Sequence, residues 1–256
     1  MRITQSIMSR NLIQNLNLNR ETMTELQNSA ATGKSVNQSS DDPVKFSRGA
    51  RYRKTLSQYE QYGRNINNGL GWVDNNALVM NEFHSLVVDA RSIAIQGSDA
   101  SQSQETRVVL SDRINGMIEQ SVAILNSTYL GKSIFSGTDT HNLHPFEYDG
   151  ATVVYSGNEG KVNRRISEGM DIEINVTGGE LAGSGVFDAL VELRDALAIN
   201  DPARAAELMD DLEQAADNVM GLESKNGLAR HHMDMTLQRL ETAKTNINSF
   251  LSESED

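Results

Sequence analysis

The sequence predicts a mainly α protein: an elongated antiparallel bundle of long helices, similar to a coiled coil, with a small β-rich domain inserted between its helical halves. Each half of the chain carries a long track of mostly apolar residues, spaced alternately three and four positions apart. Such a track places one seam on one face of a helix and requires a partner helix. Aromatic residues make up only 5% of the chain, which suits a thin bundle better than a thick core. Between the two tracks the hydrophobic period changes to that of strands.

The two tracks define the residues that we expect to pack helix against helix. In the first half these are Leu56, Ile66, Leu70, Val73, Met80 and Val87. In the second half they are Leu208, Leu212, Val219, Leu222, Met233, Leu240 and Ile247. The tracks also pass through polar positions such as His84 and Asn226. Because burying one Leu, Ile or Val contributes about 1.5–3 kcal/mol, the tracks predict a rigid shaft with no pocket.

The first element expected is a helix over residues 3–31. Its heptad seam consists of Leu12, Leu16, Met23, Leu26 and Ala30, interrupted by the polar Asn19. Gly33 ends this helix, and residues 32–40 read as a polar connector. Asp42 and Pro43 then suit the N-cap and first position of a long helix that runs to about Gln96.

The next helix is expected to begin at Ser101 or Ser103, after a short turn over residues 97–99, and to run to about Tyr129. The short turn predicts antiparallel packing against the preceding helix. Strands are expected at 153–155 and at 172–176, where Ile172, Ile174 and Val176 alternate with polar residues and so predict a half-buried strand.

After the strands, a helix is expected over residues 186–199, and Asp201-Pro202 opens the second long helix. Gly221 and Gly227 lie inside that helix, where each costs about 1 kcal/mol relative to Ala and could mark a bend. The predicted organisation is an N-terminal axial helix with its connector at 1–40, a helical shaft at 41–132 and 186–256, and an inserted β-rich outer domain at 133–185.

Charge and composition exclude several classes of protein. A net charge of −12 disfavours binding to nucleic acid, which requires basic patches. The chain has no cysteine, so neither disulfides nor thiolate metal sites can form. No apolar run is long enough to span a membrane. Residues 1–19 lack the apolar core of a cleaved signal peptide, so export would use a route that needs none.

The motifs that suggest chemistry are weak. Gly33-Lys34-Ser35 and Gly131-Lys132-Ser133 resemble part of a phosphate-binding loop, but Asn28 and Asn126 stand where its first glycine is required.

Two other groups of side chains also have ordinary explanations. His231, His232 and Asp234 lie within one helical turn without a further ligand nearby in sequence, and Asp41 and Asp42 are better explained by helix capping. We therefore expect no catalytic, cofactor-binding or metal-binding residues, no cofactor and no enzymatic activity.

Several segments resemble a known family. Residues 29–37, followed by Ser40-Asp41-Asp42-Pro43, resemble the N-terminal signature of bacterial flagellins and their junction relatives. The opening residues 1–4 and the segments 61–66 and 134–138 are more similar to the hook-associated protein 3 branch of that family. The signature positions are Gly33, Asp41, Asp42, Pro43, Asn65, Asn126, Gly131, Phe135, Gly137, Pro145 and Phe146. The resemblance covers about the first 150 residues, and beyond them it is one of architecture.

The resemblance implies a structural subunit that joins the flagellar hook to the filament and is needed for flagellar assembly and motility. It implies self-association in a ring, with the hook-side junction protein (hook-associated protein 1) and flagellin as neighbours. It further implies a flagellar secretion chaperone and a location in the extracellular flagellum, reached by type III flagellar export. Binding to nucleic acid or membrane is not expected.

In this family the C-terminal helix usually continues further and pairs with the N-terminal helix. Here the second track is unfinished at Asp256, which predicts a shortened chain whose N-terminal seam lacks its natural partner.

Three alternatives stay open at this point. Flagellin has the same kind of shaft with a different outer domain. A non-flagellar coiled-coil scaffold would rarely carry a β-rich insertion. An enzyme housed in the β-rich domain would need a site that the motifs do not indicate.

Overall fold

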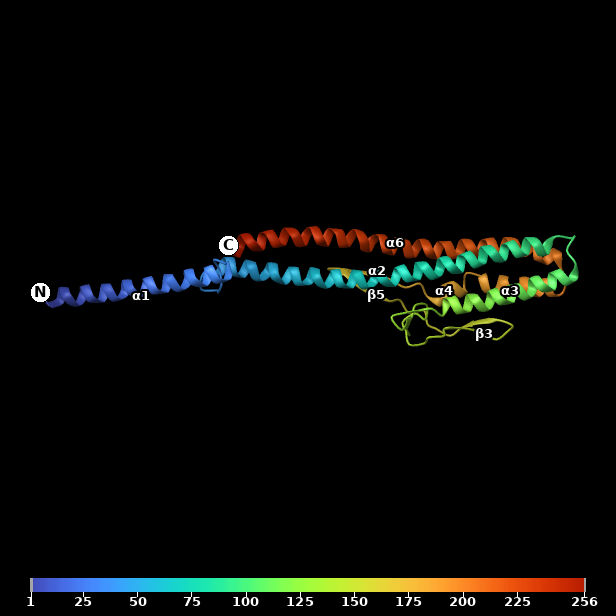
Figure 1. The fold of residues 1–256 in the computed structure, drawn as a ribbon, viewed down its shortest axis with the longest axis horizontal. Helices are drawn as coiled ribbons and strands as arrows, with labels where there is room; N and C mark the ends of the chain where they lie inside the picture. The colour runs from blue at the N-terminus through green and yellow to red at the C-terminus, as the bar shows by residue number, and fades with distance from the viewer. Residues whose placement is uncertain (1, 256) are drawn as a thin grey trace. The chain divides into compact units, whose positions relative to one another are not determined.

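The computed structural model describes residues 2–255, and it describes side chains from residue 7 to residue 255. The predicted fold class is confirmed, because long helices account for most of these residues and the strands occupy one small region (Figure 1). The helices are α1 (Arg2–Thr32), α2 (Pro43–Ser98), α3 (Gln104–Leu125), α4 (Gly178–Ala182), α5 (Val186–Ala198) and α6 (Pro202–Glu255). The strands are β1 (Thr128–Tyr129), β2 (Lys132–Ser133), β3 (Phe146–Tyr148), β4 (Val153–Tyr155), β5 (Asn163–Ser167) and β6 (Met170–Glu173).

The chain divides into two compact units. One comprises residues up to Gln61 together with those from Gln238 onward, and the other comprises Tyr62–Leu237. Helices α2 and α6 each contribute a part to both units. These limits differ from the predicted ones, since the strands lie in the same unit as most of the expected shaft.

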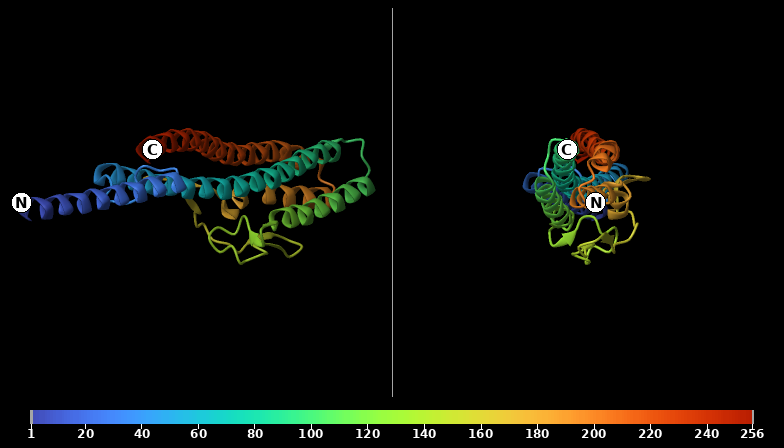
Figure 2. Two further views of the ribbon diagram at one scale, coloured as in Figure 1. Left: turned by 60° about the vertical axis from the view of Figure 1, so that its left-hand side comes forward. Right: turned by 90° about the vertical axis from the view of Figure 1, so that its right-hand side faces the viewer.

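In the second unit, α2 and α6 run antiparallel and side by side (Figures 1 and 2). An Arg91–Glu213 ion pair of 2.6 Å joins them near one end, and an Arg230–Asp74 ion pair of 2.6 Å joins them further along. Helix α3 packs against α5, where the Ser111 hydroxyl donates to the Arg194 carbonyl at 2.8 Å. We use the name "shaft" for α3, α5 and the parts of α2 and α6 within residues 62–237.

The core of this unit lies between the shaft helices and reaches the strands. Phe83 of α2, Phe187 of α5 and Phe146 of β3 are buried, and Phe187 lies 5.8 Å from each of the other two rings between centroids. Aromatic rings in tilted contact add to the stability gained from burial alone. Three of the few aromatic residues of the chain therefore cluster where β3 meets the helices.

Three antiparallel two-stranded ribbons, β1–β2, β3–β4 and β5–β6, account for the strands within residues 2–255. We call residues 128–177 the β-region. The prediction that α3 continues to Tyr129 is wrong, because Thr128 and Tyr129 pair with Ser133 and Lys132 instead. The expected strand at 153–155 is present as β4.

The expected strand at 172–176 is only partly correct. Strand β6 ends at Glu173, although Ile174 and Val176 are buried as predicted. Asn175 and Thr177 were expected to face solvent but are buried as well. Asn175 is held inside because its side chain bonds to the backbone N–H of Val162 and to the carbonyl of Gly160. Thr177 is buried as the N-cap of α4.

The helix ends follow from capping. Ser103 is the N-cap of α3, where its side chain accepts a bond from the Thr106 N–H. Asp201 accepts bonds from the N–H groups of Ala203 and Arg204 at the start of α6. Helix α6 is continuous through Gly221 and Gly227, so neither glycine breaks it.

The first unit contains α1, the connector, the start of α2 and the end of α6. Tyr52 and Phe250 bring α2 and α6 together with ring centroids 6.1 Å apart. The connector is attached to α6, since the N–H of Ser35 donates to the Glu255 carbonyl at 2.7 Å and Val36 is buried. In the described part of the chain, no helix combines the length and apolarity that crossing a bilayer requires.

Candidate functional site

The seam between α2 and α6 is a packing surface of the shaft. Within residues 62–237, eight of the track residues are at most 1% exposed: Ile66, Val73, Met80, Val87, Leu208, Leu212, Val219 and Met233. Leu70 and Leu222 are half-buried. Burial of each apolar side chain contributes about 1.5–3 kcal/mol, so the seam contributes a large part of the stability of this unit.

Ion pairs lie along the seam, and their partners are opposite each other in the antiparallel alignment of α2 and α6. Arg230 binds Asp74 on the opposite helix and also Asp234 on its own helix. These side chains are about half exposed, and such pairs contribute at most about 1 kcal/mol. Their main effect is to favour one alignment of the two helices.

In the first unit the track residues are less deeply buried. Leu240 is buried, whereas Leu56 and Ile247 are half-buried. These track residues of the first unit are therefore less well covered than those within residues 62–237.

The apolar stripe of α1 is exposed. Leu12, Leu16, Met23 and Leu26 retain 62%, 54%, 63% and 65% of their accessible surface. Ile13 and Leu18 are also exposed, so much of the large apolar surface of α1 has no cover in the described chain. A contiguous exposed apolar surface is typical of a contact with another chain or segment.

The connector after α1 is ordered by its signature residues. Gly33 adopts φ +71°, a left-handed conformation that a residue with a side chain rarely takes, and its N–H donates to the Ser29 carbonyl at the end of α1. Asp42 accepts bonds of 2.9 Å from the N–H groups of Val44 and Lys45, which makes it the cap of α2.

Asp41 organises the connector itself. Its carboxylate accepts bonds of 2.9 Å from the backbone N–H groups of Gln38 and Asn37, and these bonds lower the pKa of Asp41 below its usual value. Asp42 is therefore a helix cap, as the sequence predicted in preference to an acid–base pair, whereas Asp41 is a turn residue of the connector and not a cap.

Asn126 joins the end of α3 to the β-region. Its Nδ2 donates to the Phe146 carbonyl at 2.8 Å, and its Oδ1 accepts from the Phe146 N–H at 3.0 Å. These two bonds satisfy the backbone N–H and C=O of Phe146 on the side of β3 where no strand pairs with it. Asn65 on α2 makes a similar attachment, because its Nδ2 donates to the Arg165 carbonyl at 2.8 Å.

The remaining signature residues lie around the start of the β-region. Phe135, Pro145 and Phe146 are buried. Gly137 has φ +72°, and a Cβ atom there would lie 2.1 Å from the Asn158 carbonyl oxygen, so no other residue fits. Gly131, which also has positive φ, occupies the β1–β2 turn.

Tyr155 closes this part of the core. Its hydroxyl bonds to the carbonyls of Phe135 and Asn158, both at 3.0 Å. Burial and the nearby Glu159 carboxylate raise the pKa of Tyr155 to about 12, so the phenol stays neutral and donates at physiological pH.

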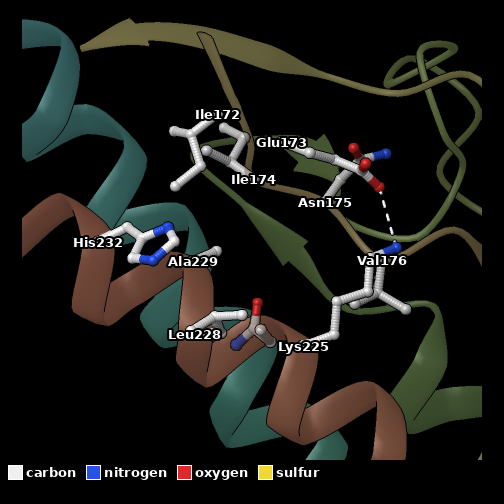
Figure 3. A pocket seen from close by; sticks show the side chains of 10 residues that line it. Ile172, Glu173, Ile174, Asn175, Val176, Lys225, Leu228, Ala229 and His232 are labelled. Atoms are coloured by element: carbon white, nitrogen blue, oxygen red, sulfur yellow. Dashed lines mark hydrogen bonds and ion pairs between the residues drawn. The ribbon is translucent and has the colours of Figure 1, made fainter. Parts of the chain in front are cut away.

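A small apolar pocket of about 180 Å³ lies between the β-region and α6 (Figure 3). Ile172 and Ile174 line one side, and Leu228, Ala229 and His232 of α6 line the other. The dashed line in Figure 3 marks the ion pair of Glu173 with Lys225, 3.1 Å long. The lining offers no grouping of nucleophile, base or metal ligands, so the pocket itself suggests no chemistry.

The segments that resembled chemical motifs are structural. Gly33-Lys34-Ser35 is part of the connector, where Lys34 forms an ion pair with Glu255. His231 and His232 are exposed. Across residues 2–255, no three His, Asp or Glu side chains are grouped so that they could hold a metal ion.

Two important positions were not predicted from the sequence. Arg107 is buried and donates to the carbonyls of Gly97 and Asp99 and to Asn200, which ties together the two turns at one end of the shaft. Asn76 is fully buried but lies beside the heptad track, and no local pattern distinguishes it from its exposed or half-buried neighbours.

Comparison with known proteins is consistent with this architecture. Residues 3–140, more than half of the chain, match the family model of the bacterial flagellin N-terminal helical region. A flagellin of Halalkalibacterium halodurans is 22% identical over 240 residues, which are 94% of this chain and 78% of that protein. The flagellar hook-associated protein 3 of Salmonella typhimurium is 25% identical over 193 residues, which are 75% of this chain and 60% of that protein.

Solved structures share the fold. A protein of Vibrio parahaemolyticus described as a flagellar hook-associated protein superposes with a TM-score of 0.76 at 18% identity. The superposition covers 84% of this chain and 100% of that one. The arrangement of long helices with one small strand-containing region is therefore the same in both.

Proposed function

The chain belongs to the bacterial flagellin family, and on that premise we propose that it is a structural subunit of the bacterial flagellum that joins the hook to the filament. The observation that carries the proposal is the apolar seam of α2 and α6, within a fold that matches the whole of a protein described as hook-associated. A buried seam between two long helices suits a component that transmits force along its length.

We further propose that copies of the chain associate in a ring between hook-associated protein 1 and flagellin. The exposed stripe of α1 supports this, because Leu12, Leu16, Met23 and Leu26 require apolar cover that the described part of the chain does not supply. Contacts between copies would be heterologous, which generates rings or helical assemblies.

The proposed location is the extracellular flagellum, reached by type III flagellar export without a cleaved signal peptide and with the help of a secretion chaperone. A chain without cysteine suits passage in an unfolded state, because no disulfide has to form or be reduced. The proposed role is structural and involves no catalysis.

Flagellin is the second candidate. The observation in its favour is the 22% identity to a flagellin over 94% of this chain. The hook–filament junction is preferred because the β-region is small and because the relative from Salmonella typhimurium is a flagellar hook-associated protein 3.

The test is an in-frame deletion of the gene in the source bacterium, followed by electron microscopy and analysis of the culture medium. A junction subunit predicts cells with hooks but no filaments and with flagellin released unpolymerised into the medium. The wild-type gene supplied on a plasmid should restore filaments. Filaments that persist after the deletion would contradict the proposal. Missing filaments without released flagellin would favour the second candidate.

A further inference from the structure

Two asparagine side chains are buried where the α2–α6 seam meets the segment after β6. Asn76 of α2 is completely buried and Asn226 of α6 is 4% exposed. The Nδ2 of Asn76 lies 3.0 Å from the Ile174 carbonyl oxygen and 3.4 Å from Oδ1 of Asn226. The Nδ2 of Asn226 in turn donates to the Val73 carbonyl of α2 at 2.8 Å. One network therefore links both shaft helices to the β-region.

The packing next to this network is unusually close. Gly69 lies one heptad before Asn76, and a Cβ atom at Gly69 would be 2.8 Å from the Met233 sulfur and 3.5 Å from Cγ2 of Ile174. Ile174 therefore lies against α2 close to Met233 of α6, near the point where Asn76 holds its carbonyl group. Figure 3 shows Ile174 from the neighbouring pocket, with α6 on the other side.

An asparagine pair is a costly choice for this position. An apolar pair would contribute more to stability, since buried amides give up bonds to water and recover little net free energy for each internal bond. Within the described residues, Oδ1 of Asn76 accepts no hydrogen bond, so this residue serves as a donor only. Buried asparagines in helix seams are known to select one alignment at a cost in stability.

We propose that Asn76, oriented by Asn226, is the positioning residue that fastens the end of the β-region to the seam of the shaft. The Ile174 carbonyl receives its bond from Asn76, while Asn226 holds the amide of Asn76 and binds the backbone of α2. The β-region then keeps one position relative to the two helices. This proposal concerns the single chain and does not depend on the function proposed above.

The ion pair that joins the same end of the β-region to α6 is more exposed than this network. The Lys225–Glu173 ion pair is partly exposed, with 41% and 23% of the two side chains accessible, so solvent screens its attraction. Trp72 packs edge-on against Tyr129, with ring centroids 6.0 Å apart. Because Trp72 is the single tryptophan of the chain, its fluorescence reports directly on the contact between α2 and the β-region.

Hydrogen exchange of the full chain with the Asn76→Leu substitution tests the proposal. Leucine is close to asparagine in shape but offers no donor to the Ile174 carbonyl and brings no charge into the buried seam. We expect the backbone N–H groups of Val162 and Ile174, which bond within this segment, to exchange at least about tenfold faster. Trp72 emission should shift to longer wavelength, while exchange in the rest of α2 and α6 stays unchanged.

The matched control is Asn75→Leu. Asn75 precedes Asn76 on α2 and is half-buried, but its Nδ2 donates only to the Gly71 carbonyl of its own helix. This substitution should leave the exchange of Val162 and Ile174 as in the wild type. Equal acceleration in both variants would overturn the proposal.

A double substitution, Asn76→Leu with Asn226→Leu, keeps the proposal falsifiable if the single Asn76→Leu variant does not fold. We expect a thermal midpoint equal to or above that of the wild type, because the seam becomes wholly apolar, together with the same faster local exchange near Ile174. Unchanged exchange near Ile174, or faster exchange spread evenly through the shaft, would overturn the proposal.

Discussion

The seam of α2 and α6 and the stripe of α1 carry the same heptad pattern but differ completely in burial. Val73, Met80 and Val219 are fully buried on the shaft, whereas Leu12 and Leu26 keep more than 60% of their accessible surface. The residue types are alike, so the difference lies in the presence of a partner helix. A heptad track thus predicts a packing face, and the rest of the structure decides what covers that face.

The largest effect expected is from a charge placed in the seam. Val219→Asp would bury an unpaired carboxylate and cost at least about 4 kcal/mol, a large share of the 5–15 kcal/mol by which proteins are ordinarily stable. Leu16→Asp, in the exposed stripe of α1, should change the free energy of unfolding by less than about 0.5 kcal/mol. Urea unfolding followed by circular dichroism measures both. If the two substitutions lower the free energy of unfolding by similar amounts, the seam and the stripe of α1 do not differ in burial as described.

A cavity gives the next largest effect. Leu212→Ala removes a fully buried side chain and should cost about 2–5 kcal/mol. Leu26→Ala, in α1, is the matched control and should fall within about 0.5 kcal/mol of the wild type. The same unfolding experiment applies, and a cost for Leu26→Ala near that of Leu212→Ala would mean that α1 has a partner in the isolated chain.

The cap of α2 has a smaller effect. Asp42→Ala removes the bonds to the N–H groups of Val44 and Lys45 and should cost about 1 kcal/mol. Asp42→Asn keeps an acceptor at this position and should be nearly neutral. If the two substitutions destabilise equally in urea unfolding, the cap does not contribute as described.

The smallest effect concerns pH and the connector. The pKa of Asp41 is lower in the folded protein than in the unfolded chain, so its contribution to stability is complete above about pH 4 and is lost as the pH falls through the folded-state pKa. The N–H groups of Asn37 and Gln38 should lose their protection in that acidic range, while the seam stays protected. Nuclear magnetic resonance of these amides across the titration measures the change. In Asp41→Asn the same amides should show no transition near this pH, and a transition that persists would rule out Asp41 as its cause.

Much of the helical framework could be predicted from the sequence. Asp42, Ser103 and Asp201 mark helix starts because their side chains accept bonds from the first free N–H groups. The heptad spacing identified the seam residues of the shaft. These signals are local, and local signals are the ones that a sequence shows directly.

The errors arose where distant residues compete with a local preference. Helix α3 ends at Leu125 because Asn126 bonds to Phe146, twenty residues further along the chain. Asn175 is buried because Val162 and Gly160 bind its side chain. Asn76 lies off the track, and its role depends on Ile174 and Asn226, which are far away in sequence.

Crosslinking tests the antiparallel seam most directly, because the natural chain contains no cysteine. We expect a short thiol crosslinker to join cysteines placed at Asp74 and Arg230, and those placed at Arg91 and Glu213, since each pair forms a 2.6 Å ion pair between α2 and α6. Cysteines at Asp74 and Glu213 should not be joined within one chain. Efficient crosslinking of that third pair in the monomer, with none in the first two, would contradict the account.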